Sequence, residues 1–500
     1  MNQTYETDVV VVGAGNAALC AAISAKELGS RVLVLEKAEK EKRGGNSFFT
    51  DGAIRFAYKG LTAIREIVEL DEEAAGKISM PEYTEEDYYS DLMRVTEGKS
   101  DPELARQLVS QSFETISWMR NHGVKFELNA ENQSYEKDGK RHFWGGLPVR
   151  TYHKGIGLVQ KLNQRLGELG VDVWYGARAV RLTKEDERIT GVIVQHGENE
   201  IDIKASAVIL ACGGFEANKA MRSRFMGAEW EAAIVRGTEH NTGDGLQMAL
   251  EAGAEKYGDW SGCHSIGTDY HAPKVGDFNK PGDIFKKSSF PLGLIINKNG
   301  ERFVDEGADF RNYTYAKYGR EVLKQPDHMA FQVFDAQVRS MLRSEYNLEE
   351  ATCYQADTLE ELADLIPVAK EQFLQTLEAY NSAVQDGEYN PTVKDGKRTE
   401  GITPAKSNWA LRMDQGPFYA YPVTCGITFS FGGLHVSPEG EVLTKERQPL
   451  PGLFAAGEMI GGIFYENYPG GSGLMSGAVY GKLAGASAAG YVKQGNLIKS

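Results

Sequence analysis

Residues 9–18 read VVVVGAGNAA, an apolar run that passes directly into a glycine-rich turn. A continuous run of β-branched residues predicts a parallel strand buried on both faces, and residues 19–22, LCAA, continue as a helix. Gly13 permits the tight turn, Gly15 lets a pyrophosphate approach the backbone, and Ala18 allows close packing of helix on strand. The stretch therefore predicts the strand, turn and helix of an α/β domain that binds a dinucleotide.

A second predicted strand, residues 31–35, ends at Glu36, about 20 residues after the glycine motif. An acid at this distance can bind the ribose hydroxyls of an adenosine, which a glycine turn in a nucleotide-free domain would not need. The charged loop 37–43 then leads into a second glycine-rich turn, GGNS at 44–47. FAD is long and needs a second backbone cradle, whereas a plain NAD domain has no obvious use for one. The sequence therefore favours FAD.

Later segments repeat the pattern of a buried strand followed by small residues. They are AVILACGGF at 207–215, PGLFAAGE at 451–458 and PGGSGL at 469–474, the last of which opens a helix rich in Gly and Ala. In this order, and over nearly the whole chain, the motifs resemble the flavoprotein subunit family of succinate dehydrogenase and fumarate reductase. The resemblance implies an α/β fold, with a Rossmann-like FAD-binding domain of the glutathione-reductase type and an inserted α+β capping domain.

The domain organisation follows from that resemblance. We expect the FAD-binding domain at 1–259, with a helical insertion at about 60–150 that decorates it. The capping domain, which holds the substrate against the flavin, is expected at 260–428. The chain then returns to the FAD-binding domain at 429–500.

The resemblance also assigns cofactor contacts. The first turn binds the pyrophosphate, Glu36 the adenosine ribose and Glu458 the ribityl chain. The start of the last helix faces flavin N1 and O2, where it stabilises the charge of reduced flavin. The expected cofactor-binding residues are Gly13, Gly15, Asn16, Ala17, Ala18, Glu36, Lys37, Gly44, Gly45, Asn46, Ser47, Gly52, Ala179, Val180, Ala211, Gly213, Asn241, Thr242, Asp244, Gly457, Glu458, Ser472, Gly473 and Leu474.

The loop after the ribose acid indicates how FAD is attached. Some family members attach FAD to a histidine in the loop after the ribose acid, but the corresponding loop here, GGNSFFTDG, has none. We therefore expect non-covalent FAD.

The motif NTGDG at 241–245 matches a family motif near the flavin, and it also fits a simple turn that caps the helix 246–252.

The composition limits the partners, metal sites and location that we expect for the protein. The net charge of −15 argues against nucleic acid and anionic membranes as partners. The five cysteines lie far apart, which predicts no disulfide framework and no metal or iron–sulfur site. The chain shows no signal peptide and no apolar run of the roughly 20 residues that a membrane span requires. The expectation is a cytoplasmic protein without a transmembrane segment.

Chemistry on a C–C bond needs hydride exchange with the flavin, proton exchange on the neighbouring carbon, and a clamp for the carboxylate or carbonyl. The segment 331–339 resembles the strand and turn before the family's catalytic arginine. Arg339 is therefore the expected proton-transfer residue, with Asp335 or Glu306 as a relay. His264 stands where the family binds a carboxylate. The alternatives are a surface arginine and a structural histidine.

Two departures from fumarate reductases remove positive charge, because Phe429 replaces a histidine and Tyr468 replaces an arginine. Segments such as ERFVDEGADFRNYTYAKYGR at 301–320 more closely resemble the tricarballylate dehydrogenase subgroup. That resemblance implies a carboxylate substrate, dehydrogenated or, in reverse, reduced at the α–β C–C bond. The expected substrate-binding residues are Arg311, Tyr313, Tyr315, Arg55 and Phe429.

Two other functions remain open. Tyr468 followed by a Pro-Gly turn resembles 3-ketosteroid dehydrogenases, in which a tyrosine acts on an enone or ketone. The chain could also be a flavin electron-transfer subunit without a small substrate. Only one dinucleotide fingerprint is found, so quinone, free reduced flavin or a redox partner protein is the expected electron route rather than NAD(P)H.

Overall fold

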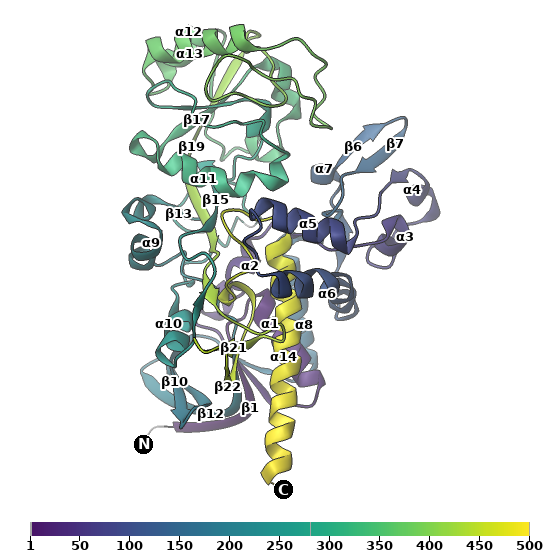
Figure 1. Cartoon of the computed structure of the whole chain (residues 1–500), viewed down its shortest axis with the longest axis vertical. Helices are drawn as coiled ribbons and strands as arrows, with labels where there is room; N and C mark the ends of the chain where they lie inside the picture. The colour runs from purple at the N-terminus through teal and green to yellow at the C-terminus, as the bar shows by residue number, and fades with distance from the viewer. Residues whose placement is uncertain (1–2, 281, 500) are drawn as a thin grey trace.

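The computed structural model describes residues 3–280 and 282–499 (Figure 1). Its first sheet has eight strands, and β1 (Gln3–Val12) lies between β12 (Asn199–Leu210) and β2 (Val32–Leu35), parallel to both. The four valines of β1 are at most 6% exposed, as expected for a strand covered on both faces. The remaining strands are β9 (Asp172–Trp174), β10 (Ala177–Glu185), β11 (Arg188–His196), β21 (Glu441–Leu443) and β22 (Pro449–Ala455).

Two helices far apart in the sequence pack side by side on this sheet (Figure 1). They are α1 (Asn16–Glu27) and the C-terminal helix α14 (Ser472–Lys499). Glycines make the close approach possible, because a Cβ at Gly481 would lie 2.4 Å from the Ala17 carbonyl oxygen. The packing therefore fixes the start of α14 beside the start of α1.

A second, six-stranded sheet forms the part of the molecule drawn at the top of Figure 1. Its central strand β19 (Phe418–Ser430) pairs with four of the other five strands. Helix α11 (Tyr315–Leu323) packs on β15 (Cys263–Asp269), and two helices cover the far end. The other elements are β13 (Ile234–Val235), β16 (Leu294–Asn297), β17 (Ala330–Phe334), β18 (Tyr354–Ala356), α12 (Leu359–Leu365) and α13 (Lys370–Ala383).

The segment at about 60–150 is not only helical. It carries α3 (Gly60–Arg65), α4 (Glu72–Gly76), α5 (Glu85–Val95), α6 (Pro102–Asn121) and α7 (Ala130–Gln133). Its short strands also build two three-stranded sheets, one of which includes the hairpin β6 (Ser134–Lys137) and β7 (Lys140–Phe143). The remaining short strands are β3 (Ala53–Ile54), β4 (Ile78–Ser79), β5 (Phe126–Leu128) and β8 (Val149–Thr151).

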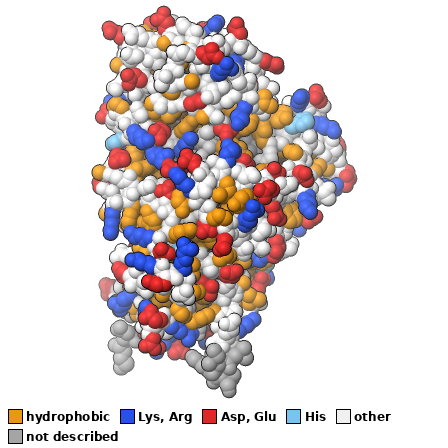
Figure 2. Space-filling model, viewed as in Figure 1, with side chains coloured by type: hydrophobic (Ala, Val, Ile, Leu, Met, Phe, Trp, Pro, Cys, Tyr) orange, Lys and Arg blue, Asp and Glu red, His pale blue; other side chains and the backbone are white. Residues whose placement is uncertain are grey.

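Acidic and basic side chains are interspersed over the face shown in Figure 2. Within residues 3–280 and 282–499, no helix combines the length and the apolar character needed to cross a membrane.

Candidate active site

A cleft of about 300 Å³ is lined by residues of both large sheets and of the segments that join them. One part is lined by the glycine turn after β1, and another by side chains from the second sheet and its loops. The cleft therefore joins the predicted nucleotide site to the predicted substrate site.

The turn after β1 has the geometry that the sequence predicts. Gly13 has φ +109°, and a Cβ there would lie 2.5 Å from the Ala211 carbonyl oxygen, so only glycine fits. Gly15, which precedes α1, has no side chain to cap the helix, and the Asn16 N–H donates to the Ser47 hydroxyl at 2.9 Å. The remaining N–H groups of this N-terminus are suited to an anion such as a pyrophosphate.

Glu36 lies at the end of β2 and is 7% exposed. One carboxylate oxygen accepts the Ala38 N–H at 2.8 Å. Burial raises the pKa of the Glu36 carboxyl, with hydrogen bonds from the backbone opposing it. Its position beside the glycine turn is the one required to bind ribose hydroxyls.

Most of the predicted cofactor residues line the cleft. They are Gly13, Gly15, Asn16, Ala17, Glu36, Lys37, Gly45, Asn46, Ser47, Ala179, Ala211, Gly213, Asn241, Thr242, Asp244, Gly457, Glu458, Gly473 and Leu474. The motif at 241–245 thus both borders the cleft and precedes α10 (Asp244–Glu251).

Five predicted cofactor residues do not line the cleft. Ala18 is fully buried, and Val180 is 37% exposed. Gly44 and Gly52 are required by neighbouring protein atoms, since a Cβ would lie 2.8 Å from Val159 and 2.3 Å from Thr151. Ser472 is fully buried and accepts a hydrogen bond from the Tyr88 hydroxyl at 3.0 Å. Apart from the exposed Val180, these residues pack against other protein atoms rather than against the cleft.

A buried carboxyl pair lies beside the cofactor part of the cleft. Glu458 lines the cleft, whereas Glu216, which the sequence analysis missed, does not. Glu216 Oε1 accepts the side-chain amides of Asn46 and Asn241, each at 2.6 Å. Glu458 accepts the Ser430 N–H at 2.7 Å, and its carboxyl group neighbours that of Glu216. Burial raises the pKa of both carboxyls, and the charge of Glu458 raises that of Glu216 further. The two carboxyls therefore bind a proton more readily than exposed carboxyls do.

Cationic side chains gather in the substrate part of the cleft, two of them in ion pairs. Arg236 pairs with Asp283, and Lys286 lies 3.3 Å from Asp51. Although burial opposes the shift, Lys286 and nearby Lys154 lower the pKa of Asp51. These two carboxylates neutralise the cations that they contact.

Arg311 and Arg343 also line the cleft, but neither is paired with a carboxylate among the described residues. Arg311 donates to the Asn312 side chain at 2.7 Å, and its buried Nε has no partner in the described part of the chain. Burial and the charge of Arg311 lower the pKa of Arg343 to about 10. Neither guanidinium forms an ion pair among the described residues, although the charges of Glu345 and Asp51 act on Arg343. Two neighbouring guanidiniums of this kind form a site for an anion.

Aromatic side chains continue from the arginines along the cleft. The Arg311 guanidinium lies 5.2 Å from the Tyr315 ring centre, and the hydroxyls of Tyr315 and Tyr468 are 2.6 Å apart. Phe429 lies 5.2 Å from Tyr468, and its ring is stacked with His264 at 5.5 Å. All five of these side chains line the cleft.

His264, on β15, is 3% exposed, and its Nδ1 has no hydrogen-bond partner within the described residues. Burial, with a smaller contribution from the charge of Arg236, lowers the pKa of His264 well below its ordinary value. The imidazole is therefore neutral at neutral pH and can accept or donate one hydrogen bond to a ligand.

The predicted proton-transfer residue and its relay lie elsewhere, which corrects that prediction. Arg339 is on the 3₁₀ helix Ala336–Met341 and packs 5.1 Å from the Tyr419 ring, outside the cleft lining. Glu306 is fully buried in an ion pair with Arg302, and Asp335 caps the 3₁₀ helix. One turn of chain further on, Arg343 reaches the cleft instead.

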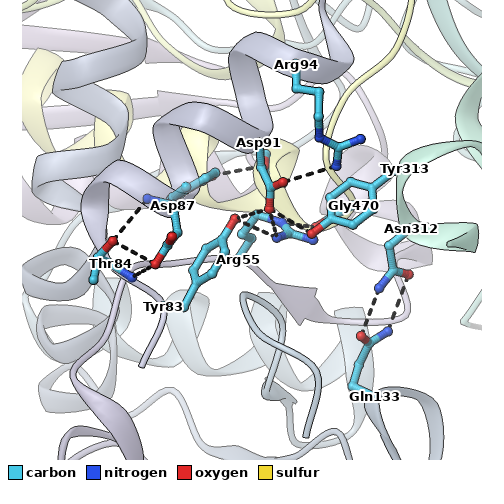
Figure 3. A network of polar contacts seen from close by, with 12 residues as sticks. Arg55, Tyr83, Thr84, Asp87, Asp91, Arg94, Gln133, Asn312, Tyr313 and Gly470 are labelled. Atoms are coloured by element: carbon cyan, nitrogen blue, oxygen red, sulfur yellow. Dashed lines mark hydrogen bonds and ion pairs between the residues drawn. The ribbon is translucent and has the colours of Figure 1, made fainter. Parts of the chain in front are cut away.

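Arg55 and Tyr313 support the site and do not line it, in contrast to the prediction (Figure 3). Arg55 is fully buried and donates to the Gly470 carbonyl oxygen and the Tyr83 hydroxyl, each at 2.9 Å. The Tyr313 hydroxyl donates to Asp91 on α5 at 2.7 Å. This network holds the turn before α14 and joins the 60–150 segment to the second sheet.

Three cleft cations, Arg236, Lys286 and Arg343, were also missed. Single cations scattered among surface charges give no periodic signal, and only the fold brings them together. The tyrosine pair, the histidine and Arg311 were all singled out from the sequence, and the structure places them in one cleft.

The glycine turn, the buried acid after β2 and the start of α1 together form a site for a dinucleotide. Residues 8–474 match the family model described as an FAD binding domain, and the chain belongs to this family, with the succinate dehydrogenase and fumarate reductase flavoproteins. It is an FAD-dependent oxidoreductase that acts on CH–CH groups.

Three similar proteins extend the comparison. A vinyl phenol reductase of Lactiplantibacillus plantarum is 27% identical, with 98% of each chain covered. An NADH:fumarate oxidoreductase of Klebsiella pneumoniae is also 27% identical, over 96% of this chain, which spans about half of that relative (47%). The open conformation of a flavocytochrome c3 fumarate reductase is 26% identical, with a TM-score of 0.72 over 98% of this chain and 79% of that chain.

Proposed function

We propose that this chain reduces, or in reverse forms, a C=C bond next to a carboxylate. The observation that carries the proposal is the pair Arg311 and Arg343, two cleft guanidiniums without a carboxylate partner among the described residues. Guanidinium groups bind carboxylates through two parallel hydrogen bonds. The substrate carboxylate supplies the missing counter-ion.

The residues fit FAD along the rest of the cleft. The turn at 13–17 would hold the pyrophosphate, Glu36 the ribose, and Glu458 the ribityl chain. When bound and reduced by an external two-electron donor, such as a quinol or a redox partner protein, FAD supplies a hydride to one alkene carbon. A proton is added to the other carbon, so that alkene, hydride and proton give the saturated acid.

Arg311 is our candidate for the proton donor. It lies in the cleft beside the ring of Tyr315, and its Nε has no partner among the described residues. The adjacent charge of Arg343 reduces the cost of releasing a proton, since two buried like charges repel. Both guanidiniums also stabilise the negative charge that develops on the carboxylate side of the alkene after hydride addition.

The test is reoxidation of the reduced, FAD-loaded protein. The chain is reduced anaerobically with dithionite and mixed with fumarate, acrylate or a tricarboxylic alkene, and the return of flavin absorbance is followed by stopped flow. Rapid reoxidation by at least one unsaturated acid, with the saturated acid as product, is the expected result. No reoxidation by any acid, but rapid exchange with a redox protein, would favour the electron-transfer subunit instead.

A second candidate is an enone or 3-ketosteroid substrate. The observation that favours it is the pair of hydroxyls on Tyr315 and Tyr468, 2.6 Å apart, which could polarise a ketone oxygen. Reoxidation by a 3-keto-steroid enone, but by no unsaturated acid, would select this candidate.

We also propose that FAD is held without a covalent bond, because the loop from Lys37 to Gly52 contains no histidine. Acid precipitation of the yellow protein should release all the flavin into the supernatant. Flavin that stays with the pellet would contradict the proposal.

A further inference from the structure

The row of side chains that leads away from Arg311 changes from charged to aromatic. Tyr315 lies beside the guanidinium, Tyr468 touches Tyr315 through the two hydroxyls, and Phe429 lies next to Tyr468. The Phe429 ring is in turn 5.4 Å from Phe431 and 6.0 Å from Phe464, and all of these residues line the cleft. A ligand anchored on the arginines therefore extends over aromatic rings.

Phe429 and Tyr468 also border the start of α14. A Cβ on Gly473 would lie 3.5 Å from the Phe429 ring and 3.9 Å from the Tyr468 ring. This helix end is the one that the cofactor assignment directs toward the flavin ring. The aromatic row is thus next to the reacting part of the cleft and belongs to the substrate site.

A second carboxylate on the ligand would find no unpaired cation along this row of described residues. The two cations that act on His264 are both paired. Arg236 is held by Asp283 through its Nε, at 3.0 Å, and an Nη nitrogen, and Lys286 lies 3.3 Å from Asp51. The polar groups in the row itself are neutral, namely two phenols and an imidazole. Burying an unpaired carboxylate among them is costly, whereas an aromatic ring gains favourable contacts there.

His264 supplies an independent indication that a ligand reaches the row. Its ring is stacked on Phe429, the residue is only 3% exposed, and its Nδ1 has no partner in the described chain. A buried nitrogen without a partner is costly unless a ligand or water satisfies it. A planar ligand beside Phe429 with a polar ring substituent can meet this nitrogen.

We propose that the substrate is an aryl-substituted unsaturated monocarboxylate, with its carboxylate on Arg311 and Arg343 and its ring among Tyr315, Phe429 and Tyr468. This inference rests on the proposed C=C reduction. The hydride goes to the ring-bearing carbon, the proton goes to the carbon next to the carboxylate, and the product is the 3-arylpropanoate. The two electrons come from the reduced flavin.

The experiment compares acids that differ only at the end away from the carboxylate. The FAD-loaded protein is reduced with dithionite and mixed with 3-phenylacrylate, acrylate or fumarate. We expect kcat/KM for 3-phenylacrylate to exceed that for acrylate and fumarate by at least about tenfold, which corresponds to about 1.4 kcal/mol. Equal values for phenylacrylate and acrylate, or a preference for fumarate, would overturn the inference while C=C reduction stands.

A variant localises the effect. Phe429→Ala should remove most of the preference for phenylacrylate over acrylate and leave FAD content unchanged. Tyr152→Ala, at an aromatic residue that is 46% exposed and outside the cleft lining, is the matched control. If Phe429→Ala does not fold, Phe429→Leu retains a large apolar side chain and removes the ring. A preference that survives in the folded variant would contradict the ring site.

A binding measurement separates this inference from the reaction. The oxidised FAD-loaded protein is titrated with 3-phenylpropanoate or succinate, and the shift of the flavin absorbance is followed. Tighter binding of 3-phenylpropanoate supports the ring site even if no acid is reduced, an outcome that would remove the proposed reaction alone. Tighter binding of succinate would overturn the ring site.

Discussion

The two halves of the cleft differ in whether backbone or side-chain atoms line them. The cofactor half is formed mainly by backbone, namely the turn at 13–17 and the starts of α1 and α14. The substrate half is formed by side chains from separate loops, among them Arg311, Arg343 and His264. A backbone cradle tolerates no added atom, whereas a side-chain site can lose one group and still bind weakly. The comparison predicts different responses to mutation in the two halves.

The largest effect is expected in the cofactor half. Gly13→Ala should abolish FAD binding, because its Cβ would lie 2.5 Å from the Ala211 carbonyl oxygen and its φ of +109° is strained for alanine. The variant should purify colourless and remain so after incubation with FAD. The control is Gly167→Ala, a site where a Cβ meets nothing within 4 Å. A yellow Gly13→Ala protein would contradict the rigid-cradle view.

The next effect belongs to the substrate half. Arg311→Gln should lower turnover by about 10²–10⁴-fold, the range for removal of a general acid, with FAD content unchanged. Arg339→Gln, outside the cleft lining, should retain turnover and is the matched control. Stopped-flow reoxidation by an unsaturated acid measures both. Loss of activity in the control, with Arg311→Gln still active, would restore the assignment made from sequence.

This difference also explains what could be predicted from the sequence. The strand, the glycine turn and Glu36 are local signals, since each requires a particular residue type at a fixed distance along the chain. Arg343 has no such local signal. Only the fold shows that Arg339, on the 3₁₀ helix Ala336–Met341, lies outside the cleft lining and that Arg343 lies in it. For Arg55 the sequence misleads in the opposite direction. It follows the flavin loop in sequence, but in the structure it is fully buried under the turn before α14 and does not line the cleft.

The 60–150 segment provides a smaller test of the substrate half. Asn132 accepts both Nη groups of Arg343, the second at 3.1 Å. Gln133 and Asn312 pair through their amides, with one bond at 2.8 Å (Figure 3). Asn312 also accepts from Arg311 at 2.7 Å. Neighbouring residues of one segment thus orient both guanidiniums of the anion site.

Gln133→Ala should therefore raise KM for the unsaturated acid by about threefold to tenfold, from the loss of about 1 kcal/mol of hydrogen bonding, with kcat less affected. Gln372→Ala, at an exposed position of α13, is the control. Gln133→Glu keeps the acceptor for Asn312 and should recover part of the affinity. A parallel fall in kcat and FAD content would instead indicate a general loss of structure.

The smallest effect concerns the carboxyl pair of Glu216 and Glu458, beside the cofactor half. The pKa of both Glu216 and Glu458 is raised by burial, so the folded chain binds a proton more tightly than the unfolded chain. The stability that this proton contributes is fully present below the ordinary carboxyl pKa of 4.5 and is lost as the pH rises through the raised value. The melting temperature of the flavin-free protein should fall over this range.

Glu216→Gln keeps the two amide contacts within reach and removes the second carboxyl, so the melting temperature should depend less on pH above 4.5 than in the parent chain. Glu446→Gln, at an exposed carboxyl, should leave the dependence unchanged. If both variants followed the parent curve, Glu216 and Glu458 would not share a proton. The cofactor half would then depend on backbone fit alone, with no contribution from this titrating pair.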